Sequence, residues 1–242
     1  ASMTLLAAQM DFTEAGELTL FINESEVSFL EDMMWRNGYL DAAQMAGAFQ
    51  LLRSNDLVWS RLQHEYLMGE RPRSSDLMAW NADSTRMPYR MHSEYLRQLF
   101  LENAFATGKF EVEGHPVTPR DIQAPIFAVG TETDHVAPWK SAYKTGALTR
   151  SEVTFALTNG GHNAGVVSEP GHHHRHFRLG RILRNNHFIS AEEWAEQAEM
   201  HEGSWWLAWA DWLKGQQRGE PIAPPKMGKA ICDAPGTYVL MR

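Results

Sequence analysis

Two short apolar runs in the second half of the chain define its predicted core. Residues 126–129 read IFAV and residues 153–157 read VTFAL, and glycine follows each run, at Gly130 and at Gly160–Gly161. Runs of this length bounded by glycine are typical of buried strands in a parallel sheet, with a helix between them. The pattern therefore predicts an α/β fold with a crossover helix over residues 140–148.

Helical spacing of apolar residues dominates the block from residue 20 to residue 95. Val27, Leu30, Met34 and Trp35 follow two acidic residues at near-helical spacing and predict one helix with these apolar residues on one side. The same spacing predicts further helices over 40–52, 57–69 and 92–105. This block follows a predicted strand within residues 2–12 and interrupts the sheet. We therefore divide the chain into a core strand (1–19), a helical insertion (20–95) and the rest of the α/β core (96–242).

Weaker local signals complete the predicted elements. Residues 109–122 alternate like a small hairpin that turns at Glu113–Gly114. Ser190 precedes a helical pattern with two glutamates in its first turn, which is typical of a helix start. A later helix from residue 201 places Trp205, Trp209 and Trp212 on one face, which we interpret as core or interface.

Two groups that can handle protons follow the two predicted strands. Asp134 comes after the first strand and His162 after the second. Taken alone, each residue favours a structural role: Asp134 as a turn acid that caps a helix, and His162 as a buried histidine bonded to backbone. Because the carboxyl ends of parallel strands meet at one edge of a sheet, we expect the two side chains within bonding reach, as an acid–base pair.

The chain order of an acid followed by a histidine is that of the α/β-hydrolase fold, whose nucleophile precedes both on a Gly-x-Ser-x-Gly elbow. No such elbow, with serine or cysteine at its centre, occurs in these 242 residues. Gly203–Ser204 lies after the histidine and is followed by two tryptophans, and the single cysteine, Cys232, has no elbow around it. The sequence thus contains two of the three members of a catalytic triad.

Several motifs resemble the C-terminal half of polyhydroxyalkanoate synthases, which join 3-hydroxyacyl-CoA units into storage polyester. The motifs are TETDHVAPW (131–139), TNGGHNAG (158–165), HEGSWW (201–206), APGTYV (234–239), LRSNDLVW (52–59) and DLMAWNADSTRMP (76–88). The resemblance runs nearly end to end and implies the C-terminal part of an α/β-hydrolase fold with an inserted helical cap. It also implies a cysteine nucleophile in a Gly-x-Cys-x-Gly elbow, with Asp134 as catalytic acid and His162 as catalytic base.

The resemblance extends to substrate and partners. It implies a 3-hydroxyacyl-CoA substrate and a growing polyester, a cap that gates acyl-CoA entry, a homodimer formed through the cap, and a polymer granule surface in the cytoplasm. Arg53 falls where the family has a cap arginine suited to CoA phosphates, although a solvated surface arginine explains it equally well. His135 is a second candidate substrate-binding residue, with a structural role as its alternative.

Composition restricts the other function classes. The chain has 22 basic and 30 acidic residues and a net charge of −8, which argues against a nucleic-acid partner. One cysteine excludes a disulfide framework and suits a reducing compartment, and no apolar run has the length of a membrane span. The cluster HHHRH (172–176) has adjacent histidines whose spacing does not suit one metal ion, so we expect no metal site and no cofactor.

Two further functions stay open from the sequence. One is a nucleophile-free homologue that acts as a binding or granule-associated partner, and the other is a hydrolase of small esters with the same acid and base. Residues 1–12 resemble the strand just after the elbow helix of the synthases. We therefore expect that the 242 residues alone have no synthase activity, and that an uncovered sheet edge makes them aggregate or dimerise unless another chain completes the sheet.

Overall fold

The computed structural model describes most of the chain. It divides into two compact units, one formed by residues 1–40 and 87–217 and the other by residues 41–86 and 218–242. The residues whose structure is described are 1–41, 44, 59–60, 62–70, 80, 86–182, 189–220, 222–234 and 236–237.

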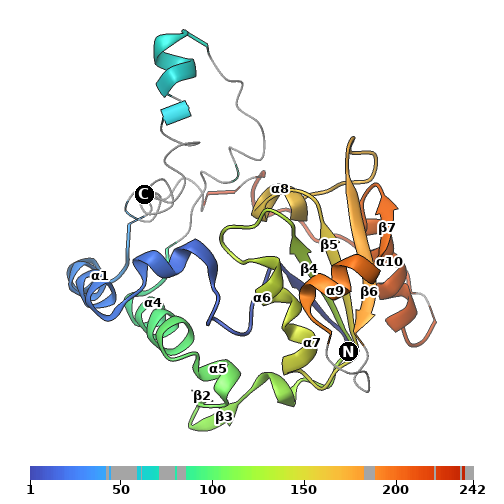
Figure 1. Ribbon diagram of the computed structural model, residues 1–242, viewed down its shortest axis with the longest axis horizontal. Coiled ribbons are helices and arrows are strands. Elements are labelled where there is room, and N and C mark those ends of the chain that lie inside the picture. Colours follow the sequence, from blue (N-terminus) through green and yellow to red (C-terminus); the bar gives the residue numbers. More distant parts are fainter. Residues whose placement is uncertain are drawn as a thin grey trace. The chain divides into compact units, whose positions relative to one another are not determined.

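A five-stranded mixed sheet forms the centre of the first unit (Figure 1). Its order is β1-β4-β5-β6-β7, in which β1, β4 and β5 are parallel and β6 and β7 are antiparallel to their neighbours. The sheet confirms the predicted α/β class. The strands are β1 (Met3–Leu6), β4 (Ile126–Thr131), β5 (Val153–Thr158), β6 (His176–Ile182) and β7 (Glu199–Glu202).

Alternate residues of β4 and β5 face two separate hydrophobic clusters, because successive side chains of a strand point to opposite sides. On one face, Ile126 and Phe155 pack against α6 (Trp139–Tyr143) and α9 (Ala191–Gln197). On the other face, Phe127 and Ala156 pack against α10 (Trp205–Gln216). Every residue of β4 and β5 is buried, as expected for strands covered on both faces.

The other elements of the first unit connect or flank this sheet. A small antiparallel hairpin turns at Glu113–Gly114, as predicted, with both residues at positive φ. Its strands are β2 (Phe110–Val112) and β3 (His115–Val117). The helices are η1 (Gly16–Phe21), α1 (Glu24–Asn37), α4 (Tyr89–Glu94), η4 (Tyr95–Leu101), α5 (Ala104–Thr107), η5 (Pro119–Asp121), α7 (Thr145–Leu148) and α8 (His162–Val166).

Several predicted elements differ in detail from the structure. The crossover helix is two short helices, α6 and α7, rather than one. The predicted helix over 92–105 is interrupted at Asn103, which adopts a left-handed backbone conformation (φ 49°) before α5. Trp35 is 75% exposed although it lies on the predicted apolar side of α1, whereas Val27 and Met34 of the same helix are fully buried.

The predicted cap (20–95) stays a prediction. Residues 41–86 of this block belong to the second unit, where η3 (Leu62–Leu67) is a π-helix, and the rest belongs to the first unit. Most of the helix predicted over 40–52 lies outside the described residues.

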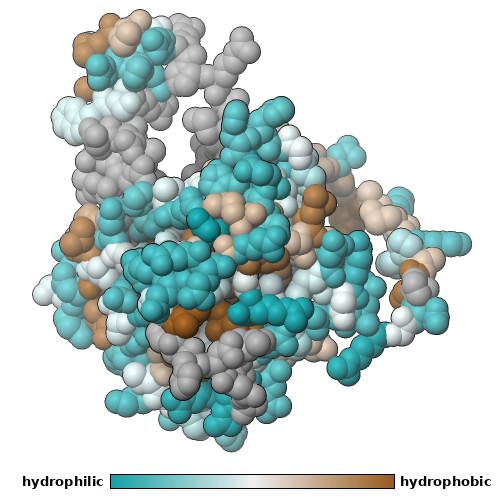
Figure 2. All heavy atoms as spheres, turned by 45° about the vertical axis from the view of Figure 1, so that its right-hand side comes forward, coloured by the Kyte–Doolittle hydropathy of each residue, from teal (hydrophilic) through white to brown (hydrophobic). Residues whose placement is uncertain are grey.

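Within the described part of the chain, no helix has both the length and the apolar character needed to cross a membrane. Hydrophilic residues dominate the face that Figure 2 presents.

Candidate acid–base site

Asp134 and His162 lie at the same edge of the sheet. Strands β4 and β5 are parallel neighbours in register from Ile126 opposite Val153 to Thr131 opposite Thr158, so their carboxyl ends coincide. Asp134 follows the end of β4, and His162 is the first residue of α8, which follows β5. The topology therefore brings together two residues that are 28 positions apart.

The two side chains form a direct hydrogen bond. Nδ1 of His162 lies 2.9 Å from Oδ2 of Asp134. The Asp134 side chain is completely buried, whereas the side chain of His162 is 38% exposed. The pair thus consists of a buried acid and a histidine that solvent or a ligand can reach from one side.

Four donors surround the Asp134 carboxylate. Oδ2 also accepts a hydrogen bond from the hydroxyl of Thr131 at 3.0 Å. Oδ1 accepts from the backbone N–H groups of Val136 at 2.9 Å and Ala137 at 2.8 Å. Burial alone would raise the pKa of Asp134, but the bonds from His162 and from the backbone outweigh it and lower the pKa below its ordinary value. Asp134 is therefore ionised at neutral pH.

An ionised Asp134 determines which nitrogen of His162 carries the proton. A carboxylate accepts hydrogen bonds but cannot donate them, so Nδ1 of His162 must be the donor. In the neutral imidazole, Nε2 is then unprotonated and can accept a proton from an attacking thiol or hydroxyl. The buried negative charge also stabilises the imidazolium that results. The geometry is that of a general base oriented by an acid.

Backbone contacts join the two loops that carry this pair. The N–H of Thr133 donates to the carbonyl of Gly160 at 3.1 Å, and the N–H of Glu132 donates to the carbonyl of Thr158 at 2.9 Å. Asn159 is held in turn by the loop before β6, since its side chain donates to the carbonyl of His174 at 2.8 Å. Hydrogen bonds therefore connect the loops after β4 and β5 and the loop before β6 at the carboxyl edge of the two parallel strands.

The other candidate residues that the structure describes do not bond to this pair. Nδ1 of His135 lies 3.5 Å from a carboxylate oxygen of Glu17 in η1. Arg53 lies outside the described residues. In the HHHRH cluster, His172 bonds to Glu169 at 2.8 Å. Among the described residues, no group of three or more His, Cys, Asp and Glu side chains is arranged to hold a metal ion.

Sequence reasoning missed two features of the site. Thr131 is fully buried at the end of β4 and its hydroxyl bonds Asp134, but a threonine at a strand end carries no specific signal in the sequence. The second is strand β6, which begins at His176 inside the HHHRH cluster and which no sequence pattern predicted. Its short run FRLGRI alternates too weakly to stand out without knowledge of its partner strands.

Comparisons with known proteins give one consistent result. The chain is 39% identical over 245 residues to a poly(3-hydroxyalkanoate) polymerase of Methylorubrum extorquens. It is 38% identical over 243 residues to a poly(3-hydroxyalkanoate) polymerase subunit PhaC of Rhizobium etli, and 36% identical over 249 residues to that of Cupriavidus necator. No protein-family model matches the chain.

These alignments cover nearly all of this chain but only part of each relative. They include 100%, 99% and 99% of the chain, and 40%, 37% and 42% of the respective relatives. The chain thus spans about two fifths of the length of these polymerases. The resemblance inferred from the motifs is confirmed, because similarity extends from one end of the chain to the other.

Proposed function

We propose that this chain, which is similar over its whole length to part of the poly(3-hydroxyalkanoate) polymerases, forms a part of such an enzyme. The enzyme would transfer 3-hydroxyacyl groups from CoA to a growing polyester and release CoA. The proposal includes an α/β-hydrolase fold for the complete protein, with a helical cap built from the block 20–95. The observation that carries it is the 2.9 Å contact between Asp134 and His162 at the carboxyl edge of the sheet.

The proposed reaction has two acyl transfers, each with one proton taken by His162. In the first, Nε2 of His162 takes the proton of a cysteine thiol, and the sulfur attacks the carbonyl carbon of the acyl-CoA thioester. The bond to the CoA sulfur breaks, and CoA leaves with the proton from His162. In the second, Nε2 takes the proton of the hydroxyl at the end of the polyester. That oxygen attacks the carbonyl carbon of the acyl–cysteine thioester, the bond to the cysteine sulfur breaks, and the imidazolium of His162 returns the proton to regenerate the thiol.

The role of Asp134 in both transfers is electrostatic and geometric. Its carboxylate holds the Nδ1–H form of His162 and stabilises the positive charge that develops on the imidazole. The cysteine would come from outside these 242 residues, since Cys232, their single cysteine, has no elbow around it. The steps move only acyl groups and protons, so we propose them without a metal or redox cofactor.

The proposal assigns substrate contacts to two further residues. Arg53 would bind CoA phosphates, since a guanidinium makes paired hydrogen bonds to phosphate oxygens. His135 would contact substrate near Asp134; its side chain is 43% exposed beside Glu17. A homodimer formed through the cap and a reaction at the surface of a cytoplasmic polymer granule complete the proposal.

The experiment that tests the function compares two histidine substitutions in the complete polymerase. His162→Gln should reduce CoA release from 3-hydroxyacyl-CoA by at least about 10³-fold, because it removes the base. His172→Gln is the matched control, since His172 also bonds a carboxylate through Nδ1 at 2.8 Å, but that carboxylate, on Glu169, is 55% exposed, whereas the Asp134 side chain is buried. The proposal is wrong if His162→Gln retains activity comparable to that of His172→Gln.

A further inference from the structure

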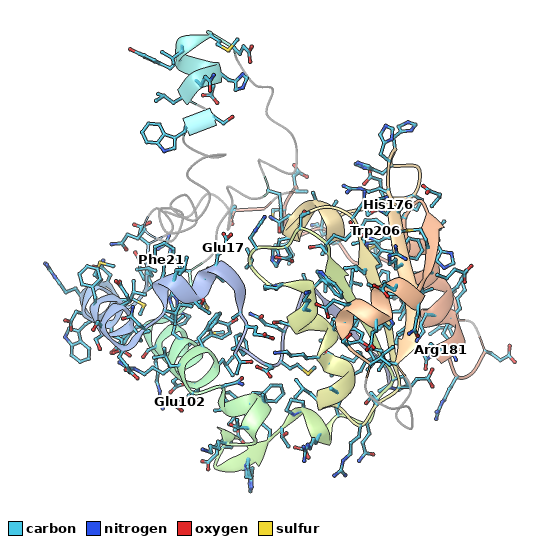
Figure 3. All side chains as sticks on the ribbon, in the orientation of Figure 1. Glu17, Phe21, Glu102, His176, Arg181 and Trp206 are labelled. Carbon is cyan, nitrogen blue, oxygen red and sulfur yellow. The ribbon has the colours of Figure 1, made fainter. Side chains whose placement is uncertain are left out.

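Three consecutive carbonyls at the end of α8 each accept a hydrogen bond from a different side chain. Nη2 of Arg175 donates to the carbonyl of Ala164 at 2.7 Å. The indole N–H of Trp205 donates to the carbonyl of Gly165 at 3.1 Å, and the indole N–H of Trp206 donates to that of Val166 at 2.9 Å. Figure 3 labels Trp206.

These bonds occupy groups that the helix itself cannot satisfy. The last four carbonyls of any helix have no partner within it. Because α8 has five residues, His162–Val166, most of its carbonyls are in this position. So short a helix is not stable in isolation, since helix nucleation is unfavourable. The position of α8 therefore depends on the side chains that bind its end.

The sheet topology explains why these donors meet at α8. Strand β6 is antiparallel to β5 and starts opposite the end of β5, which places Arg175, directly before β6, next to the His162 loop. Strand β7 is antiparallel to β6 and ends at the same edge, with Glu202 opposite His176. The chain then passes through Gly203 and Ser204 into α10, so its first residues also reach α8.

The donors are themselves fixed in place. Trp205 is 1% exposed, and its ring stacks on Phe127 of β4 with a centroid separation of 6.3 Å. The hydroxyl of Ser204 caps α10 and also donates to the carbonyl of Ser168, just beyond α8. The N–H of Gly203 donates to the carbonyl of Arg175 at 2.6 Å and joins the two donor segments. A rigid frame therefore surrounds the end of α8.

We infer that Arg175, Trp205 and Trp206 are positioning residues that hold α8 so that Nδ1 of His162 stays in contact with Asp134. The inference rests on the proposed function, in which that contact orients the base. A displacement of about 1 Å in a catalytic group costs on the order of 10²-fold in rate. Trp205 and Trp206 of HEGSWW and Arg175 of HHHRH thus act together on the helix of His162.

The first test removes a single indole N–H. In the complete polymerase, Trp206→Phe should lower kcat for CoA release about 10-fold to 100-fold and leave KM within about twofold, because it disturbs orientation rather than binding. Trp209→Phe is the matched control: this indole, on the same helix, donates to the hydroxyl of Thr4 in β1 at 3.0 Å and not to α8. Trp209→Phe should leave kcat unchanged.

The second test asks whether a side-chain hydrogen-bond donor at position 175 is what maintains kcat. Arg175→Met keeps an unbranched side chain but removes its N–H groups, whereas Arg175→Lys keeps a side-chain donor for the carbonyl of Ala164. Arg175→Met should lower kcat in the same way as Trp206→Phe, and Arg175→Lys should recover most of the loss. Because the two variants have similar bulk, this comparison decides the inference even if Trp206→Phe unfolds.

A third readout does not depend on activity. With ¹⁵N-labelled histidine, the Nδ1–H resonance of His162 reports its hydrogen bond to Asp134. Trp206→Phe and Arg175→Met should move or broaden it, and Trp209→Phe should not. Suppose that His162→Gln abolishes activity while Trp206→Phe and Arg175→Met leave both kcat and this resonance unchanged. The inference about positioning is then wrong, and the proposed function stands. If His162→Gln is active, the proposed function itself fails.

Discussion

Gly165 of α8 packs directly against Thr131 at the end of β4. A β-carbon added at Gly165 would lie 2.6 Å from Cγ2 of Thr131 and 2.9 Å from its Cβ, which is closer than atoms of this kind approach. The hydroxyl of the same threonine donates to Asp134. The helix that begins with His162 therefore touches the residue that supports the acid, and a larger residue at position 165 has to displace one from the other.

Gly165→Ala should consequently separate the acid from the base. The added methyl has no space against the backbone-anchored Thr131, so we expect a loss of about 1–3 kcal/mol in unfolding free energy together with a fall in kcat. Chemical denaturation and CoA release measure the two effects. Gly215→Ala is the control, because nothing lies within 4 Å of its added carbon. Unchanged stability and activity in Gly165→Ala would contradict the close packing.

Asp134→Asn should reduce the polymerase activity of the complete enzyme by about 10³- to 10⁴-fold with little change in folding. The amide has a similar shape, but its NH₂ group donates where the carboxylate accepts and no longer holds the Nδ1–H form of His162. CoA release gives the rate, and thermal unfolding checks the fold. A loss of less than tenfold would show that Asp134 does not orient the base.

The ion pair between Glu31 of α1 and Arg97 of η4 should make stability depend on acid pH. Nε and Nη2 of Arg97 donate to the two Glu31 oxygens at 2.7 and 2.8 Å. The Arg97 bonds and a bond from Ser93 lower the pKa of Glu31 from its ordinary 4.5 to about 2. The folded state thus holds this carboxylate ionised more readily than the unfolded chain does. Its stabilisation is fully present above pH 4.5 and is lost as pH falls through about 2.

Glu31→Gln should therefore lower the urea midpoint at pH 7 and have progressively less effect as pH falls from 4.5 towards 2. Glu94→Gln is the control, because Glu94 pairs with Arg90 on the surface, where the two side chains are 49% and 88% exposed. Such an exposed pair contributes little to stability. A difference between wild type and Glu31→Gln that stays constant with pH would argue against the pair.

The 242 residues prepared alone should release no CoA from 3-hydroxyacyl-CoA above the buffer background. They contain Asp134 and His162 but no Gly-x-Cys-x-Gly elbow, and Cys232 is exposed. A thiol-reactive dye measures free CoA directly. Release that persists in the preparation, and that Cys232→Ser abolishes, would instead identify Cys232 as a nucleophile and refute the assignment of that role to another cysteine.

Arg53→Ala in the complete polymerase should raise KM for the acyl-CoA several-fold and leave kcat nearly unchanged, since the proposed phosphate contact contributes binding rather than chemistry. Arg90→Ala serves as the control because Arg90 is 88% exposed and pairs with Glu94. Initial rates over a range of substrate concentrations separate the two constants. An equal KM for the two variants would show that Arg53 does not bind the CoA phosphates.

The sequence was sufficient for those features that depend on local pattern. The runs 126–129 and 153–157 gave strands that the structure extends to Ile126–Thr131 and Val153–Thr158, because glycine and apolar residues specify a buried strand locally. Ser190 does cap α9, through a reciprocal bond with Glu193. The contact between Asp134 and His162 followed from the order of two parallel strands.

Features that depend on partners distant in the chain were not predictable in this way. Strand β7 has four residues, and only its pairing with β6 makes it a strand. The Trp35 side chain is exposed, contrary to expectation, because the buried side of α1 consists of Val27 and Met34. Likewise, no local pattern shows that Trp205 and Trp206 bind carbonyls 40 residues earlier.

The same distance has a consequence for the order in which the protein is made. The two tryptophans leave the ribosome 40 residues after the carbonyls that they bind, a delay of about 2–8 seconds at ordinary rates of synthesis. A nascent chain therefore has its histidine before that histidine has a fixed position. By the inference drawn above, His162 acquires its fixed position against Asp134 only after the start of α10 has been synthesised.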